Sequence, residues 1–305
     1  MAVAVLSVGF GLVCGVSAMA DAGFRAIGQP SADVTDDVSA AAQRTAAAFW
    51  TQGRMTGAAG DSGPGSLIEQ SAAVKANASP AATAPQGTPT GVAFSGVKTV
   101  GALFYTTGTQ NHYCTASVVD SAHQDLLITA AHCVYGTSFA TNIAYVPGYH
   151  TGTRPYGTWT VTSIVISSRW RSAHDPNDDV AFLAVSAHGK SQIQAVTGGL
   201  VLELNGGYDR PVEVIGYNDA QSEPTRCATR SFEFQSGQQE FYCYNFRNGT
   251  SGGPWVTGYN PETGAGAVDG VIGGYEQGGL LDWASYSPYF TSAIGALFHQ
   301  AETAD

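Results

Sequence analysis

The sequence LLITAAHC at Leu126–Cys133 joins a short apolar run directly to two alanines, a histidine and a cysteine. Four residues of this kind, bounded by polar and turn-forming residues, are typical of a buried β-strand. The small alanines let an imidazole lie close to the backbone where the strand ends. The pattern therefore predicts that His132 sits at the rim of a β-structure, with Cys133 able to tether its turn to Cys114.

Similar runs recur along the chain and predict an all-β fold. They are short, rich in β-branched residues and bounded by Gly, Asn, Asp or Pro, and they cover 97–105, 117–119, 159–166, 180–185, 212–216 and 270–275. Their spacing is typical of sandwiches and barrels. Helices are expected at 287–301, where apolar residues share one face, and at the alanine-rich 38–50.

The composition agrees with a turn-rich β protein. Of 305 residues, 38 are glycine and only 12% are charged, whereas about 25% charged is average. The net charge of −11 argues against partners with phosphate backbones or anionic membranes, because these are bound by clustered Lys and Arg. The hydrophobic fraction of 44% is enough for a folded core.

The first 91 residues are expected to be processed. Residues 1–20 are apolar, uncharged and end in Ala18-Met19-Ala20, which is typical of a signal peptide; an uncleaved anchor is the alternative. Residues 21–91 are rich in Ala, Ser, Thr, Asp, Gly and Pro and are interpreted as a pro-segment and linker, with a permanent flexible arm as the alternative. Loss of Cys14 with the signal peptide leaves four cysteines, which suits an oxidising compartment.

An aspartate and a serine follow His132 in patterns that suit catalysis. In DPNDDVAFL, Asp179 directly precedes an apolar strand, where a partly desolvated carboxylate can fix the tautomer of an imidazole; Asp178 is the alternative. In NGTSGGP, glycines flank Ser251 and let the backbone turn sharply, so that the amides of Gly249 and Ser251 can face one point. Each pattern alone is also compatible with an ordinary structural turn.

In this order, TAAHC, DVAFL and GTSGGP resemble the chymotrypsin-like serine peptidases, over roughly Ala93–Phe298. Further stretches are similar to secreted bacterial members of the family: CTASVV at 114–119, VIGGY at 271–275, SPYF at 287–290 and, more weakly, the pro-segment motif WTQGRM at 50–55. The resemblance implies two six-stranded antiparallel barrels with the catalytic cleft between them. The peptidase domain would be 92–305, with 92–198 as the first barrel, 199–286 as the second and 287–301 as a C-terminal helix.

The resemblance implies a secreted serine endopeptidase. His132, Asp179 and Ser251 would form the catalytic triad, and the amides of Gly249 and Ser251 would form the oxyanion hole, with an acyl-enzyme hydrolysed by water. Protein or peptide substrates are implied, but no cofactor, metal, nucleic acid or, after signal removal, membrane; a monomer is expected. An esterase on the same triad and an inactive homologue that binds peptides or surfaces are the alternatives.

The resemblance also implies two disulfides and the substrate-binding residues. Cys227 would pair with Cys243, as Cys114 with Cys133. The base of the specificity pocket would lie near Asn245 and Phe246, and the backbone of Gly273, Gly274 and Tyr275 would pair with an extended peptide.

Three positions depart from particular relatives. No acid stands at the pocket base, so a strong preference for Arg or Lys is not supported. Ile272 occupies the position of a histidine in the glutamyl endopeptidases. Thr250 occupies the position where many animal relatives carry an aspartate that pairs with a new N-terminal amine. The oxyanion hole is therefore expected to form without that ion pair; the alternative is that another acid, Asp282 or Glu276, receives the amine.

Overall fold

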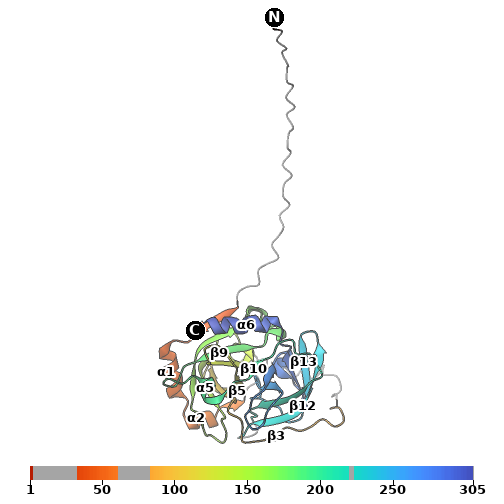
Figure 1. Cartoon of the computed structure of the whole chain (residues 1–305). Coiled ribbons are helices and arrows are strands. Elements are labelled where there is room, and N and C mark those ends of the chain that lie inside the picture. The colour runs from red at the N-terminus through yellow and green to blue at the C-terminus, as the bar shows by residue number, and fades with distance from the viewer. Residues whose placement is uncertain (3–32, 61–82, 220–222, 305) are drawn as a thin grey trace. The chain divides into compact units, whose positions relative to one another are not determined.

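Two β-sheets, one mainly from each half of the chain after residue 92, form the body of the protein (Figure 1). In the computed structural model the described residues are 1–2, 33–60, 83–219 and 223–304. The expected signal peptide at 1–20 lies outside them, apart from its first two residues.

The first sheet closes into a six-stranded barrel. Its strands are β4 (Val100–Thr107), β5 (Gln110–Val118), β6 (Leu126–Thr129), β7 (Thr141–Pro147), β8 (Trp159–Ile166) and β9 (Ala181–Val185). They pair antiparallel in the order β8-β7-β4-β5-β6-β9, and β9 pairs with β8 to complete the ring. Leu103, Tyr145, Trp159 and Leu183 fill its interior, as expected for strands whose alternate residues point to one face.

The second sheet repeats this plan with six antiparallel strands in the order β15-β14-β11-β12-β13-β16. These are β11 (Pro211–Gly216), β12 (Thr225–Gln235), β13 (Gln238–Tyr242), β14 (Pro254–Thr257), β15 (Ala267–Val271) and β16 (Ala284–Pro288), with β3 (Val92–Ala93) added beside β12 and β10 (Val201–Leu202) beside β15. Where β15 meets β16, the Val271 amide donates to Ser287 Oγ over 3.0 Å.

Helices and 3-10 turns lie outside the sheets. They are α1 (Ala40–Phe49), α2 (Gln52–Thr56), α4 (Ser168–Ala173), α5 (Ile193–Thr197), α6 (Ser292–Thr303), η2 (Ala131–Cys133), η3 (Pro176–Asp178) and η4 (Tyr275–Gly278). The buried face of α6 joins both barrels, because Leu297 packs in one cluster with Phe182 of β9 and Val268 of β15. Among the described residues, none of the helices combines the length and the apolar character that crossing a bilayer requires.

The predicted all-β double-barrel fold with a C-terminal helix is confirmed, and four of its details differ. The helix expected at 287–301 starts at Ser292, where the Thr291 hydroxyl caps it by accepting from the Ala293 amide, and residues 284–288 form β16 instead. The strand expected at 270–275 ends at Val271. Val92–Ala93 pairs with the second sheet rather than the first. The partly polar strands β7, β12, β13 and β14 have no counterpart among the predicted ones.

Residues 33–60 pack onto the first barrel. Strand β1 (Val34–Asp37) pairs with β8, and β2 (Ala59–Gly60) pairs with β5. Trp50 is 1% exposed and Met55 is 2% exposed. The Trp50 indole N–H donates to the carbonyl of Asn142 in β7. This segment thus packs its side chains against the outer face of the barrel, in a cluster separate from the barrel's interior.

A buried carboxylate in β15 makes the stability of the fold dependent on pH. Asp269 Oδ2 lies 3.5 Å from Arg210 Nη1, and Nη2 of the same guanidinium binds Glu203. Asp269 Oδ1 has no hydrogen-bond partner in the described part of the chain. Burial, only partly offset by Arg210, raises the pKa of Asp269 from 3.8 to about 7. Because the pKa is raised, the folded state binds the Asp269 proton more tightly than the unfolded state does. The stabilisation from this bound proton is fully present below about pH 4 and is lost as the pH rises through about 7.

We therefore expect Asp269→Asn to stabilise the protein relative to wild type at pH 8 but much less at pH 4.5. Chemical unfolding at the two pH values gives the difference in free energy of unfolding. Asp209→Asn, which alters an exposed carboxylate paired with Arg230, is the control and should show no such pH dependence. Equal differences for Asp269→Asn at both pH values would contradict the assignment.

Candidate active site

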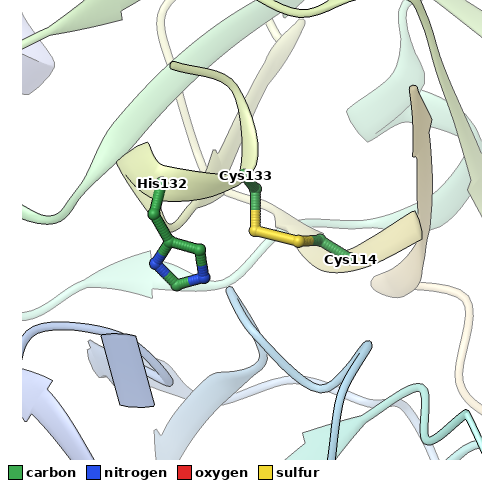
Figure 2. A group of neighbouring side chains, drawn as sticks. All are labelled: Cys114, His132 and Cys133. Atoms are coloured by element: carbon green, nitrogen blue, oxygen red, sulfur yellow. A yellow bond between two sulfur atoms is a disulfide. The ribbon is translucent and has the colours of Figure 1, made fainter. Parts of the chain in front are cut away.

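His132 is completely buried in the turn η2 that follows β6. Its neighbour Cys133 is bonded to Cys114 of β5 (Figure 2), so the turn is tied to the adjacent strand. The imidazole and the two sulfur atoms lie close enough together to look like a set of metal ligands. Because the two sulfurs are bonded to each other, neither is a thiolate, and the bridge acts as a structural tether.

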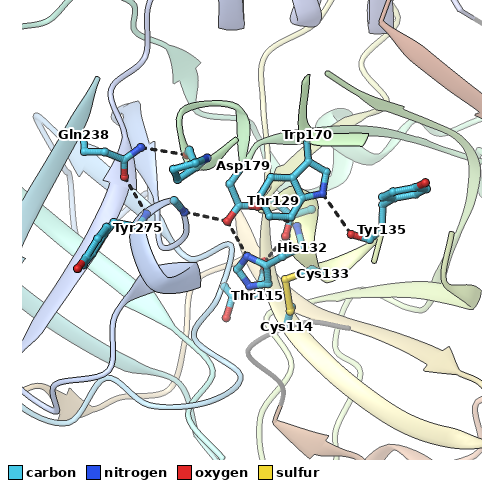
Figure 3. A network of polar contacts seen from close by, with 12 residues as sticks. Cys114, Thr115, Thr129, His132, Cys133, Tyr135, Trp170, Asp179, Gln238 and Tyr275 are labelled. Carbon is cyan, nitrogen blue, oxygen red and sulfur yellow. Dashed lines mark hydrogen bonds and ion pairs between the residues drawn. A yellow bond between two sulfur atoms is a disulfide. The ribbon is translucent and has the colours of Figure 1, made fainter. Parts of the chain in front are cut away.

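The carboxylate of Asp179 lies beside this histidine. Asp179 Oδ2 accepts a hydrogen bond from His132 Nδ1 over 2.7 Å, and Oδ1 accepts from the His132 amide over 2.8 Å (Figure 3). The amide of Gly274 donates to Oδ2 over 2.8 Å. Both partners of the pair are 0% exposed, and a buried charge needs such donors to offset its desolvation. A Cβ on Gly273 would lie only 2.9 Å from Oδ2, so glycine is needed there.

Asp178, the alternative partner for the histidine, makes different contacts. It accepts from Ser167 Oγ over 2.8 Å and lies 3.3 Å from Arg169 Nε. Burial raises the pKa of its carboxyl group. The structure thus brings Asp179, and not Asp178, to the imidazole.

Gln238 links the two segments that surround Asp179. Its side chain is buried; Nε2 donates to Pro176 O over 2.9 Å and to Asn177 Oδ1 over 2.8 Å, while Oε1 accepts from the Tyr275 amide over 2.9 Å (Figure 3). The first two acceptors precede Asp179 in the chain, and Tyr275 follows Gly274. Sequence analysis misses this residue, because no local pattern marks a glutamine whose partners are distant in sequence.

The loop that carries Ser251 is docked against the first barrel. The Thr115 amide donates to Ser251 O over 2.7 Å, and Thr115 Oγ1 donates to Gly249 O over 2.9 Å. A Cβ on Gly252, which has a φ of +78°, would clash with Thr129 Oγ1 and with a carbonyl of β5. Glycine therefore allows the loop to reach the ends of β5 and β6, and the end of β6 leads directly into the His132 turn.

Around Ser251, one imidazole nitrogen has no hydrogen-bond partner and two backbone amides have no backbone acceptor within the described part of the chain. His132 Nε2 is buried without a hydrogen-bond partner there. The amides of Gly249 and Ser251 donate to no backbone acceptor among the same residues. The loop is closed by Thr250, whose hydroxyl and amide both donate to Arg247 O, over 2.6 and 3.1 Å. A neutral turn thus occupies the place where an aspartate would form an ion pair.

A cavity of about 470 Å³ opens beside Ser251. Phe246, Ile272 and Ser285 line it, and Leu280 and Asp282 lie in the loop that completes its wall. The sequence does not mark Leu280 and Leu281 as part of the cavity, because an exposed leucine is common on any surface.

The other expected substrate-binding residues lie outside the lining of this cavity. The Asn245 side chain is engaged elsewhere, with Nδ2 donating to Gly91 O over 3.3 Å and Oδ1 accepting from Asn218 over 3.2 Å. Gly273 and Gly274 contact Asp179. Tyr275 begins η4, and its amide is bonded to Gln238. The segment is therefore not the extended strand that the sequence predicts.

The comparisons agree with this geometry. Residues 93–290 match the family model described as Trypsin. None of the curated proteins gives a significant match. Among solved structures, the protease Anisep from Arthrobacter nicotinovorans is 26% identical, with 69% of this chain and 98% of that chain covered and a TM-score of 0.62. The thermostable serine protease AL20 from an extremophilic microorganism is 27% identical, with 68% and 98% covered and a TM-score of 0.62.

A third structure, of a Glu endopeptidase in complex with MPD, shares the fold at 16% identity, with 71% of this chain and 98% of that chain covered and a TM-score of 0.55. The family model spans more than half of this chain and includes the His132, Asp179 and Ser251 segments. On this evidence the chain belongs to the trypsin family and is a serine endopeptidase.

Proposed function

We propose that this endopeptidase is secreted and cleaves peptide bonds through a triad of Ser251, His132 and Asp179. The observation that carries the proposal is the buried His132–Asp179 pair, with its 2.7 Å contact at Nδ1 and an Nε2 that no described residue binds. An imidazole held in this way is oriented to accept a proton at Nε2. The neighbouring loop supplies Ser251 as the hydroxyl to be activated.

The proposed reaction has two halves. Ser251 Oγ attacks the substrate carbonyl while its proton passes to His132 Nε2, and the imidazolium then protonates the leaving amine. Water next attacks the acyl-enzyme and gives its proton to His132. The bond to Ser251 Oγ then breaks, the imidazolium returns the proton to Oγ, and the acid is released. Asp179 stays ionised throughout and stabilises the imidazolium. The amides of Gly249 and Ser251 stabilise the oxyanion, and Thr250 keeps their turn in place without an N-terminal amine.

The acyl half of the substrate is proposed to bind along Gly273, Gly274 and Tyr275, with its specificity side chain directed toward Phe246 and the loop at Asn245. Backbone pairing with Tyr275 requires its amide to leave Gln238 Oε1, since that bond is formed in the structure. Substrate binding and the support of the Asp179 segment are therefore coupled through one side chain.

We also propose the order of processing. Residues 1–20 would direct secretion, and residues 21–91 would be a pro-segment of the domain 92–305. The two disulfides, Cys114–Cys133 and Cys227–Cys243, suit an extracellular protein.

Ser251→Ala should abolish both hydrolysis and labelling by a fluorophosphonate while leaving cooperative unfolding intact. The reason is that only the hydroxyl is removed from a loop whose backbone contacts remain. Labelling mapped by mass spectrometry and hydrolysis of an activated ester measure the effect. A variant with activity within tenfold of wild type would refute the triad, and a wild type that is not labelled would favour an inactive, peptide-binding homologue.

Gln238→Leu should lower kcat by about tenfold. It removes three side-chain hydrogen bonds, each worth about 1 kcal/mol, and a loss of about 1.4 kcal/mol in the positioning of Asp179 already corresponds to tenfold in rate. Gln239→Leu is the matched control: the neighbouring glutamine is equally buried but donates to Asp269 O on the other side of β13. Both variants should lose stability, and only the first should lose kcat. An equal loss of kcat in both would show that the effect is structural alone.

A further inference from the structure

Residues 50–60 fill an apolar groove on the surface of the first barrel. Trp50 and Met55 are buried in one cluster with Phe104 of β4 and Val146 of β7, and this cluster extends to Tyr217 of the second barrel. The groove therefore runs toward the boundary between the barrels. It is filled by the WTQGRM motif at 50–55, which has no role in the proposed reaction.

Beyond Met55, the segment reaches the loop that carries Ser251. Gly60 pairs with Tyr113 through β2 and β5. A Cβ on Gly60 would lie 2.5 Å from Asp219 Cβ and 2.7 Å from Asn248 O. Asn248 directly precedes Gly249, and the Tyr113 ring itself packs against Gly249, since a Cβ there would lie 2.6 Å from Tyr113 Cε2. The backbone of residue 60 thus covers the edge of the loop that carries Ser251.

This side of the site is the one that the leaving half of a peptide would occupy. Gly274 donates to Asp179, which in turn binds His132. The Cys114–Cys133 bridge joins the His132 turn to β5 (Figures 2 and 3). If the acyl half lies along Gly273–Tyr275, as proposed above, the chain beyond the scissile bond must pass the bridge toward Tyr113. That backbone edge is already paired with residues 59–60.

The groove also has room for a side chain of a substrate. A cavity of about 470 Å³ lies between Met55 and the rings of Phe104, Tyr113 and Tyr149, with Asp219 at its edge. Tyr217 Oη is buried there without a hydrogen-bond partner in the described part of the chain. Withdrawal of Met55 would enlarge this space into an aromatic pocket suited to an apolar side chain.

We propose that the groove holding Met55 and residues 59–60 is the binding surface for the leaving half of the substrate, and that the full-length chain blocks it with its own residues 33–60. The inference rests on the proposed function, because it places the acyl half at Gly273–Tyr275. The full-length chain then reacts at Ser251 with small reagents but excludes substrates that continue past the scissile bond. Removal of the segment opens a subsite that takes an apolar residue in place of Met55.

The test compares two probes on the full-length chain, its intact mass verified beforehand. A small fluorophosphonate has no leaving-side peptide, whereas fluorescein-labelled casein is an unfolded chain that extends on both sides of each bond. Met55→Asp places a charge in the apolar groove and should release the segment. We expect casein hydrolysis per labelled site to rise at least tenfold, with the rate of labelling within twofold of wild type.

Gly53→Asp is the matched control. It adds the same charge two residues earlier in α2, where a Cβ has nothing within 4 Å, and should leave both measurements unchanged. Trp50→Ala is a second way to release the segment and should act like Met55→Asp. Normal labelling together with equal casein hydrolysis in wild type and in both release variants would overturn the inference. Absence of labelling in every protein would instead reject the proposed function, and the inference with it.

Discussion

Three hydrogen bonds to the buried carboxylate of Asp179 hold the centre of this protein together. Two come from His132, which the first barrel supplies, and one comes from the Gly274 amide, which follows the second barrel's β15. An ionised carboxylate without water is costly unless such donors surround it. The same group that orients the imidazole therefore also requires the two barrels to meet at a fixed distance, and it couples the assembly of the fold to the chemistry of the site.

The close approach of the barrels depends on small residues at a few positions. A side chain at Gly252 would collide with the ends of β5 and β6, and one at Gly273 would press on the Asp179 carboxylate. The Cys114–Cys133 bridge removes the remaining freedom of the His132 turn. Around this frame, Gln238 spans the gap between the Asp179 segment and Tyr275, so the wall that faces a substrate and the support of the histidine share one hydrogen-bonded side chain.

The strands at 126–129 and 159–166 were predictable to the residue because uninterrupted apolar and β-branched runs are hard to place anywhere but in a sheet. The strands β7 and β12 were not, since they mix polar and apolar residues. In addition, β7 pairs with β4, which lies far before it in the chain. The helical periodicity at 287–301 was real but began too early. Residues 284–288 satisfy their backbone by pairing with β13, which a local pattern does not reveal.

The sequence by itself determined the family resemblance and the residue types of the site, because His132, Asp179 and Ser251 each lie in a short motif whose neighbours carry the information. It also determined which cysteines were available to pair. Only the tertiary structure decided that Asp179 rather than Asp178 faces the histidine, that Gln238 supports it, and that Met55 lies in a groove beside Tyr113. These contacts join segments far apart in the chain, and their partners are chosen by burial and distance after the barrels have packed, which no local pattern encodes.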